Sequence, residues 1–231
     1  MKFNKKKVLV LSLVICLVAI LSFGTLAWFN ASDEVTNIFK VANSDDPDQT
    51  PNFSVEVLET QPDSSSPSSN GVEYTGVLPG DEISKDPTVK NTGDYDQWIR
   101  VAVTLDKAQG WADAGGTLNF KELFKGSTYG SAAQVATATE KWLLADEVAT
   151  VTNDKATWYL YLNEKLSSNE TEKVFTAVNI PTVFTQQDMA FINNEFSISI
   201  KAEALQAKNT GNNAVSAFDY VNWEAGKAYG E

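Results

Sequence analysis

Apolar and polar residues alternate with a period of two in several short segments of this chain. The alternation is clearest over residues 53–59, 98–105 and 195–205. In the second of these, one face collects the aliphatic residues Ile99, Val101, Val103 and Leu105. A period of two predicts β-strands that bury one face and leave the other in water.

Three further segments have the composition of strands, although their alternation is weaker. They are residues 83–90, between the turns Pro79-Gly80 and Asn91-Thr92-Gly93, the aromatic run 156–162, and residues 172–180, which Pro181 ends. Residues 28–41 can also extend as a strand, although they could wind as a short helix. Seven or eight strands without regular helix alternation predict an all-β, antiparallel β-sandwich rather than an α/β fold.

Residues 106–154 do not fit this pattern. Gly115-Gly116 interrupts them, and Phe120–Phe124 and Ala132–Leu144 have the spacing of short helices. We therefore expect a partly helical insertion between two strands.

The first 27 residues have the pattern of a signal peptide. Lys2, Lys5, Lys6 and Lys7 precede a long uncharged apolar run, and Thr25 and Ala27 are small residues at the positions that a signal peptidase reads. Cleavage between Ala27 and Trp28 would give a secreted protein that meets the membrane only transiently. A retained membrane anchor is the alternative, because residues 8–32 carry no charge.

Composition excludes most familiar enzyme chemistry. The chain has no histidine and a single cysteine, Cys16, which lies within the predicted leader. Histidine-dependent nucleophiles, HExxH zinc sites, CxxC centres and disulfides are thus excluded. We predict no cofactor and no metal site, although Asp45-Asp46-Pro47-Asp48 and Asp81-Glu82 could attract cations without having the spacing of a calcium loop.

The net charge is strongly negative. It is −12 for the whole chain, and removing the leader, which holds four of the eighteen basic residues and none of the thirty acidic ones, leaves about −16. Nucleic acid is therefore not an expected partner. The charge either keeps an exported protein soluble or recruits cations or a basic surface.

Several short motifs occur in the same order as in a known family. They are found at residues 24–30, 37–39, 78–81, 87–93, 98–101, 158–162, 170–172, 174–175, 202–207 and at Trp223. In this order the chain resembles the TasA/camelysin family of exported Gram-positive proteins, which a dedicated signal peptidase processes. The resemblance implies a jelly-roll-like β-sandwich at the cell surface or in the biofilm matrix, with a structural role as a fibre subunit or fibre-associated protein.

The resemblance also implies a mode of assembly. Residues 28–43 would act as a donor strand that pairs with the next copy of the chain or with a paralogous subunit, while residues 44–231 form the sandwich. Such a strand would contact its partner through its apolar residues Trp28, Phe29, Val35, Ile38, Phe39 and Val41. The same segment could equally be the first strand of its own domain, since one sheet edge can accept either.

Two rival functions remain at this point. Some members of the family are described as metalloendopeptidases. A chain without histidine would have to build a zinc site from carboxylates alone. A pair of carboxylates such as Asp94 and Asp96 could instead act as acid and base in glycoside cleavage, but the sequence does not place them at the required separation. We therefore expect no enzymatic activity. A non-polymerising accessory module is the other rival, with aromatic residues of the insertion as its contact surface unless they belong to the core: Trp111, Phe120, Phe124, Tyr129 and Trp142. Arg100, the only arginine, is expected to pair with a carboxylate and pin the sheet.

Overall fold

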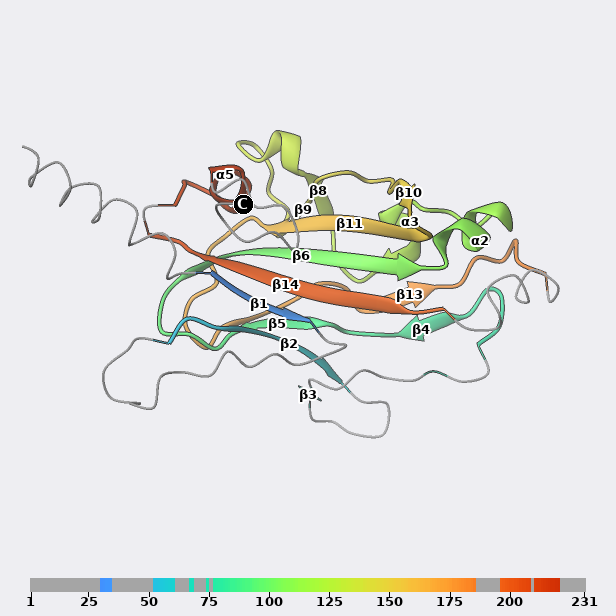
Figure 1. Cartoon of the computed structure of the whole chain (residues 1–231), viewed down its shortest axis with the longest axis horizontal. Helices are drawn as coiled ribbons and strands as arrows, with labels where there is room; N and C mark the ends of the chain where they lie inside the picture. Colours follow the sequence, from blue (N-terminus) through green and yellow to red (C-terminus); the bar gives the residue numbers. More distant parts are fainter. Residues whose placement is uncertain are drawn as a thin grey trace, which may run out of the picture.

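The computed structural model describes residues 30–34, 52–60, 67–68, 74, 77–185, 196–208 and 210–220. These residues form mostly antiparallel sheets with a few short helices, which confirms the all-β, sandwich-like prediction (Figure 1). Fourteen strands are present in the described part. That exceeds the seven or eight expected, because breaks divide two of the predicted strands and residues 106–154 supply four more.

The first layer is a seven-stranded sheet. Its order is β1-β14-β6-β11-β9-β8, with β10 beside β11. All its pairs are antiparallel except β8 with β9, which is parallel. Its strands are β1 (Asn30–Glu34), β6 (Gln97–Asp106), β8 (Tyr129–Ser131), β9 (Trp142–Leu144), β10 (Val151–Thr152), β11 (Lys155–Leu162) and β14 (Ile198–Gln206).

Two smaller sheets, β12-β5-β2-β3 and β4-β13-β7, make up the second layer. Their strands are β2 (Val55–Thr60), β3 (Pro67–Ser68), β4 (Glu82–Ser84), β5 (Thr88–Asn91), β7 (Phe124–Lys125), β12 (Thr171–Lys173) and β13 (Ala177–Asn179). The predicted strands 83–90 and 172–180 are therefore each divided in two.

The break between these two small sheets does not change the register. Thr171 lies opposite Lys90 on one side of the break and Ala177 lies opposite Ser84 on the other, with equal steps along both strands. The Val174 N–H donates to the Pro87 carbonyl at 2.8 Å, and the Lys85 N–H donates to the Thr176 carbonyl at 3.1 Å. Pro87 has no N–H to continue the ladder, which accounts for the local break. The two sheets therefore act as one layer.

The main core lies between the two layers. The four aliphatic residues predicted to share one face of β6 are all buried there, packed with Trp158 and Leu160 of β11. Val57 of β2 and Val89 of β5 face them from the second layer. This inner face of the first layer confirms the face that the alternation predicted for residues 98–105.

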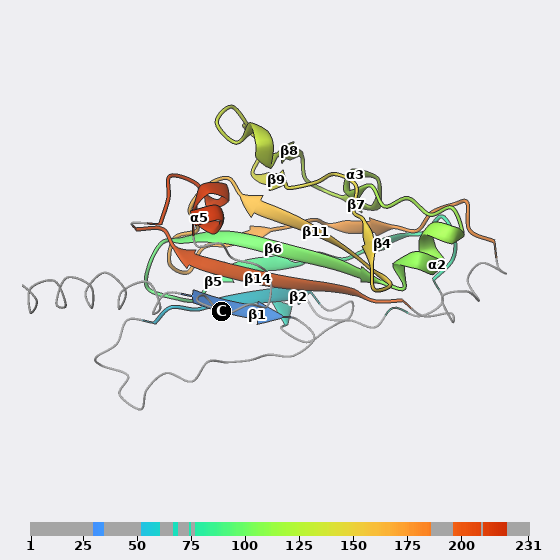
Figure 2. The same ribbon diagram turned by 45° about the horizontal axis from the view of Figure 1, so that its top comes forward.

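A second apolar cluster covers the outer face of the first layer. The helix α5 (Ala214–Tyr220) lies beside β6 and β11 (Figure 2). Its Phe218 packs against Tyr161, with 6.0 Å between ring centroids. Under this cover Glu203 and Leu205 of β14 are buried. The expectation of a wet outer face on residues 195–205 was therefore wrong for the last part of that strand, because a helix from the following segment excludes the solvent.

Residues 106–154, which connect β6 to β11, combine short helices with strands. They contain α2 (Ala108–Asp113), α3 (Phe120–Leu123) and a 3₁₀ turn, η1 (Ala132–Gln134), as well as β7 to β10. The helix expected over residues 132–144 was wrong. Only its first three residues are helical, and Trp142–Leu144 forms β9 because these buried side chains pair along β11.

The aromatic residues of this region belong to the core. Trp111, Phe120, Phe124, Tyr129 and Trp142 are all buried. The Phe120 ring centroid lies 4.4 Å from that of Phe124 and 5.0 Å from that of Tyr129. Aromatic packing of this kind stabilises the interior, so these side chains are not available as a contact surface.

The predicted turn residues have backbone roles. Gly80 has φ +88° within its turn, where a side chain would be strained. A Cβ on Gly93 would lie 2.8 Å from the Asn52 carbonyl oxygen, so that position excludes larger residues. Asn91 Oδ1 accepts from the Gly93 N–H at 2.9 Å and closes the second turn.

Candidate functional site

The strand β1 forms one edge of the first layer. β1 pairs antiparallel with β14, and Asn30, Ser32 and Glu34 lie opposite Leu205, Glu203 and Lys201. β1 also lies against β2 of the second layer, so it covers the side of the sandwich at this edge (Figure 2). This part of the N-terminal segment thus closes the sheet of its own chain.

The other residues of the predicted donor segment fall outside the described residues. This holds for the apolar contact residues Trp28, Phe29, Val35, Ile38, Phe39 and Val41, and for the predicted cleavage site between Ala27 and Trp28. The stretch that pairs with β14, residues 30–34, is the polar middle of the segment. Its described attachment is the antiparallel pairing with β14.

Beneath this edge β14 presents small side chains to the core. Ala202 and Ala204 are both buried on the inner face, and β2 lies across from them with Val55 and Val57. Small residues on β14 let the two layers approach closely where β1 ends the sheet. The edge where β1 pairs with β14 is thus backed by a packed core.

A buried ion pair occupies the outer face of the same edge. Arg100 of β6 and Glu203 of β14 are directly opposite in register, and Glu203 Oε2 lies 2.7 Å from Nε and 2.5 Å from Nη2 of the guanidinium. The rings of Phe218 and Tyr159 contact the guanidinium, with centroids 4.7 Å and 5.0 Å from Cζ. This confirms the prediction that Arg100 pairs with a carboxylate and pins the sheet.

Tyr159 has its acidity changed by this environment. Burial raises the pKa of the phenol above its ordinary value, and the Arg100 charge opposes that rise. Tyr159 is therefore neutral at ordinary pH and offers an aromatic face to the cation.

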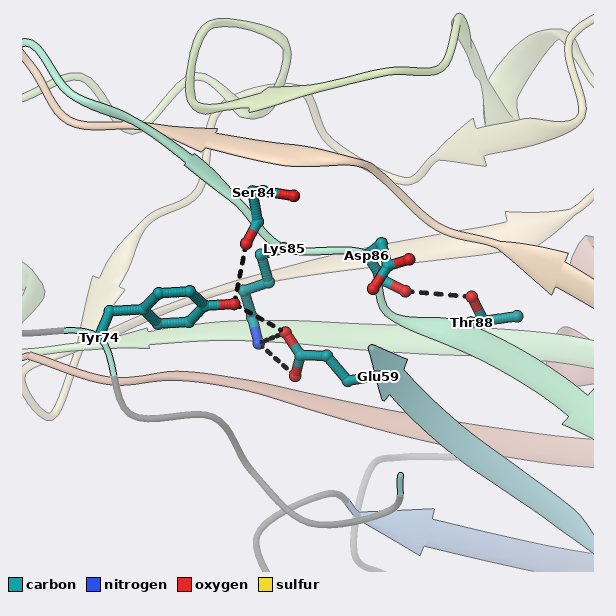
Figure 3. Close-up of polar contacts among 6 residues, drawn as sticks. All are labelled: Glu59, Tyr74, Ser84, Lys85, Asp86 and Thr88. Atoms are coloured by element: carbon teal, nitrogen blue, oxygen red, sulfur yellow. Dashed lines mark hydrogen bonds and ion pairs between the residues drawn. The ribbon is translucent and has the colours of Figure 1, made fainter. Parts of the chain in front are cut away.

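A second buried ion pair lies in the second layer, where β4 gives way to β5. Lys85 Nζ donates to both oxygens of Glu59, at 2.6 Å and 2.7 Å (Figure 3). The Tyr74 hydroxyl points to the same carboxylate at 3.4 Å and donates to the Ser84 carbonyl at 2.9 Å. Burial, followed by the nearby Glu59 charge, raises the pKa of Tyr74 well above its ordinary value.

Sequence reasoning missed both carboxylates. Glu59 lies two residues after the buried Val57 of β2, so the alternation of the strand places both on the inward face. This spacing could have indicated from the sequence that Glu59 is buried. Glu203 occupied the polar row of its strand, and no local signal showed that α5 would cover it. Both acidic residues are buried with a cation, as the cost of an unpaired buried charge requires.

Asp94 and Asp96, the pair named for acid–base chemistry, lie on the surface. They are exposed on the bend before β6, and Asp94 Oδ2 accepts from the Asn52 backbone N–H at 2.7 Å. Asp81 Oδ2 accepts from the Leu78 N–H at 2.8 Å, and Asp45–Asp48 lie outside the described residues. Within the described ranges, no three acidic, cysteine or histidine side chains gather as a metal site would need. No helix in that part of the chain has the length and apolarity to cross a bilayer.

Comparison with known proteins found no matching family model, no matching curated protein and no matching solved structure. The function therefore has to be inferred from the sequence motifs and from the geometry of the β1 edge.

Proposed function

We propose that this chain is an exported structural protein, either a subunit of cell-surface or biofilm-matrix fibres or an accessory to them, which assembles by N-terminal donor-strand exchange. The family resemblance supports this proposal, and the observation that carries it is the position of β1. This strand is the last of its sheet, comes from the extreme N-terminal part of the fold, and pairs with β14 alone in that sheet. A jelly-roll-like topology and passage through a signal peptidase belong to the same proposal.

Strand exchange at this edge follows from backbone chemistry. If β1 leaves, β14 presents a row of unpaired N–H and C=O groups, which is a template for another strand. The same segment from a second copy restores the same hydrogen bonds, so the closed monomer and the assembled form have similar contacts. Each copy then accepts one strand and donates one, and such head-to-tail addition does not close on itself, so filaments result.

The leader controls when exchange begins. A segment continuous with a membrane-held signal is not free to enter the sheet of a neighbour, and cleavage between Ala27 and Trp28 releases it. The closed position of β1 also supports the accessory alternative, in which the chain stays monomeric and joins fibres made by a paralogue.

Electron microscopy and sedimentation of two purified chains test the proposal. Residues 28–231 should form filaments, whereas residues 43–231, which lack β1, should not form them and should bind a synthetic peptide of residues 28–41. Circular dichroism of both chains is the control for folding. If residues 28–231 alone stay monomeric yet join fibres of a second subunit, the accessory role holds. Filaments formed by residues 43–231 would refute donor-strand exchange.

A further inference from the structure

We propose that the charged side chains of β14 set the register in which the N-terminal strand pairs with it. They would thereby favour residues 30–34, whether these come from the same chain or from a second copy of it, over strands with a different charge pattern. The intermolecular half of this inference rests on the proposed function, whereas the register rule also applies within one chain. The acceptor positions are Leu205, Glu203 and Lys201, which lie opposite Asn30, Ser32 and Glu34.

Glu203 restricts the residue that can lie opposite it more than the other two positions do. The residue is fully buried, and both contacts with the Arg100 guanidinium go to Oε2. Among the described residues its other oxygen, Oε1, receives no hydrogen bond, and the Lys201 Nζ lies 3.5 Å from it. A second carboxylate across from this buried one would meet like charge where water cannot screen it. The position opposite Glu203 therefore excludes an acidic residue, and this chain has Ser32 there.

Lys201 makes the opposite demand. Its side chain is only partly buried, and Glu34 occupies the position directly opposite. Opposite charges on directly opposed positions of antiparallel strands stabilise the pair, whereas like charges destabilise it. Lys201 therefore favours an acidic residue two positions after the residue that faces Glu203.

Among the registers that keep the same face of each strand, only the observed one meets both demands. A slip of one residue would exchange the two faces of the strand. A slip of two residues one way places Glu34 opposite Glu203, and a slip the other way moves Glu34 beyond Lys201, opposite Ser199. Residues 30–34, Asn-Ala-Ser-Asp-Glu, thus match the β14 charges in the observed register and in neither of the registers slipped by two residues.

Engineered disulfides can report this register directly. The chain of residues 28–231 contains every described residue and, without Cys16, has no thiol of its own. Ala31 lies directly opposite Ala204, so the double variant Ala31→Cys with Ala204→Cys should oxidise readily in oxidised glutathione. The slipped reporter, Ala31→Cys with Ala202→Cys, separates the two Cα atoms by more than about 7 Å, beyond the reach of a disulfide. We expect at least a tenfold difference in the initial rate of cross-linking.

Charge variants in the in-register reporter then test the rule. Ser32→Asp should lower the cross-linking rate on the order of tenfold, and Ser32→Asn, of similar size but uncharged, should not. Glu34→Lys should lower it roughly two- to fivefold, and adding Lys201→Glu should restore it. If Ser32→Asp and Glu34→Lys cross-link as fast as the parent, or if the slipped reporter does, the register rule is wrong.

Gels run without reductant separate this rule from the proposed function. Cross-links within one chain stay at the monomer position, and those between chains give a ladder. If every cross-linked product runs as a monomer, but the rate of cross-linking depends on the charges at positions 32 and 34, the register rule holds and strand exchange fails. If ladders form whatever those charges are, strand exchange holds and the register rule fails.

Discussion

The two buried ion pairs have similar chemistry but occupy different kinds of structure. Arg100 and Glu203 are directly opposed within the uninterrupted ladder of β6 and β14, on the outer face of the first layer. Lys85 and Glu59 are buried at a break in the second layer, between the pairing of β4 with β13 and that of β5 with β12. The first pair therefore fixes a register within one sheet, whereas the second holds neighbouring strands together where backbone pairing is interrupted.

Their surroundings differ as well. Two aromatic rings contact the guanidinium of Arg100, and α5 covers the pair. Beside the Lys85–Glu59 pair lies the phenol of Tyr74, whose hydroxyl is 3.4 Å from the carboxylate. A planar guanidinium suits a site enclosed by rings, and a lysine reaches across a gap with a flexible stem. We therefore expect removal of the cation to lower the free energy of unfolding more at the Arg100–Glu203 pair than at the Lys85–Glu59 pair.

The largest effect is expected for Arg100→Met. The change removes the closer of the two cations beside the fully buried Glu203 and leaves only the more distant Lys201, so we expect the free energy of unfolding to fall by roughly 3–5 kcal/mol. Urea denaturation followed by tryptophan fluorescence measures it. The double variant Arg100→Met with Glu203→Leu is the matched control and should recover most of the loss. An unchanged midpoint in the single variant would contradict this account.

A smaller loss is expected for Lys85→Met. Glu59 would lose its cation but keep the Tyr74 hydroxyl nearby, at the end of β2, so we expect a decrease of about 2–3 kcal/mol. The same denaturation experiment applies, with Glu59→Leu added to Lys85→Met as the control. A loss larger than that of Arg100→Met would reverse the proposed ranking of the two pairs.

The tyrosines beside the pairs predict a difference at alkaline pH. Both Tyr74 and Tyr159 have a pKa raised by folding, so each contributes stability below the unfolded pKa of about 10 that is lost as the pH rises through the folded value. The Glu59 charge adds to the rise at Tyr74, whereas Arg100 opposes it at Tyr159. Tyr74→Phe should therefore flatten the decline of stability between pH 9 and 11 more than Tyr159→Phe. Equal slopes in the two variants would refute this.

The smallest effect is expected at an exposed pair. Lys141 Nζ lies 2.8 Å from Glu172 and 3.0 Å from Glu164, with most of the lysine in water. Lys141→Ala should change the free energy of unfolding by about 0–1 kcal/mol, since solvent screens such pairs. Thermal unfolding measures it beside Arg100→Met. A comparable loss in both variants would show that burial does not set the value of these contacts.

The sequence predicted those features of the fold that depend on local pattern. The apolar row of residues 98–105, the turns at Gly80 and Gly93, and the pairing of Arg100 follow from period, turn chemistry and the cost of a buried charge. The helix over residues 132–144 was wrong because tertiary pairing of Trp142–Leu144 with β11 overrides the helical spacing. The partners Glu203 and Lys85 could not be assigned, since each pairing joins segments distant in the chain.

The position of β1 also has a consequence for how the protein reaches its folded state. Asn30, near the beginning of the chain, lies opposite Leu205, near its end, and β14 separates β1 from β6. The first strand to emerge during synthesis therefore has no place in its sheet until almost the last strand has been made. Pairings between residues so distant in the chain slow folding, so the closing of this edge is expected to be a late step.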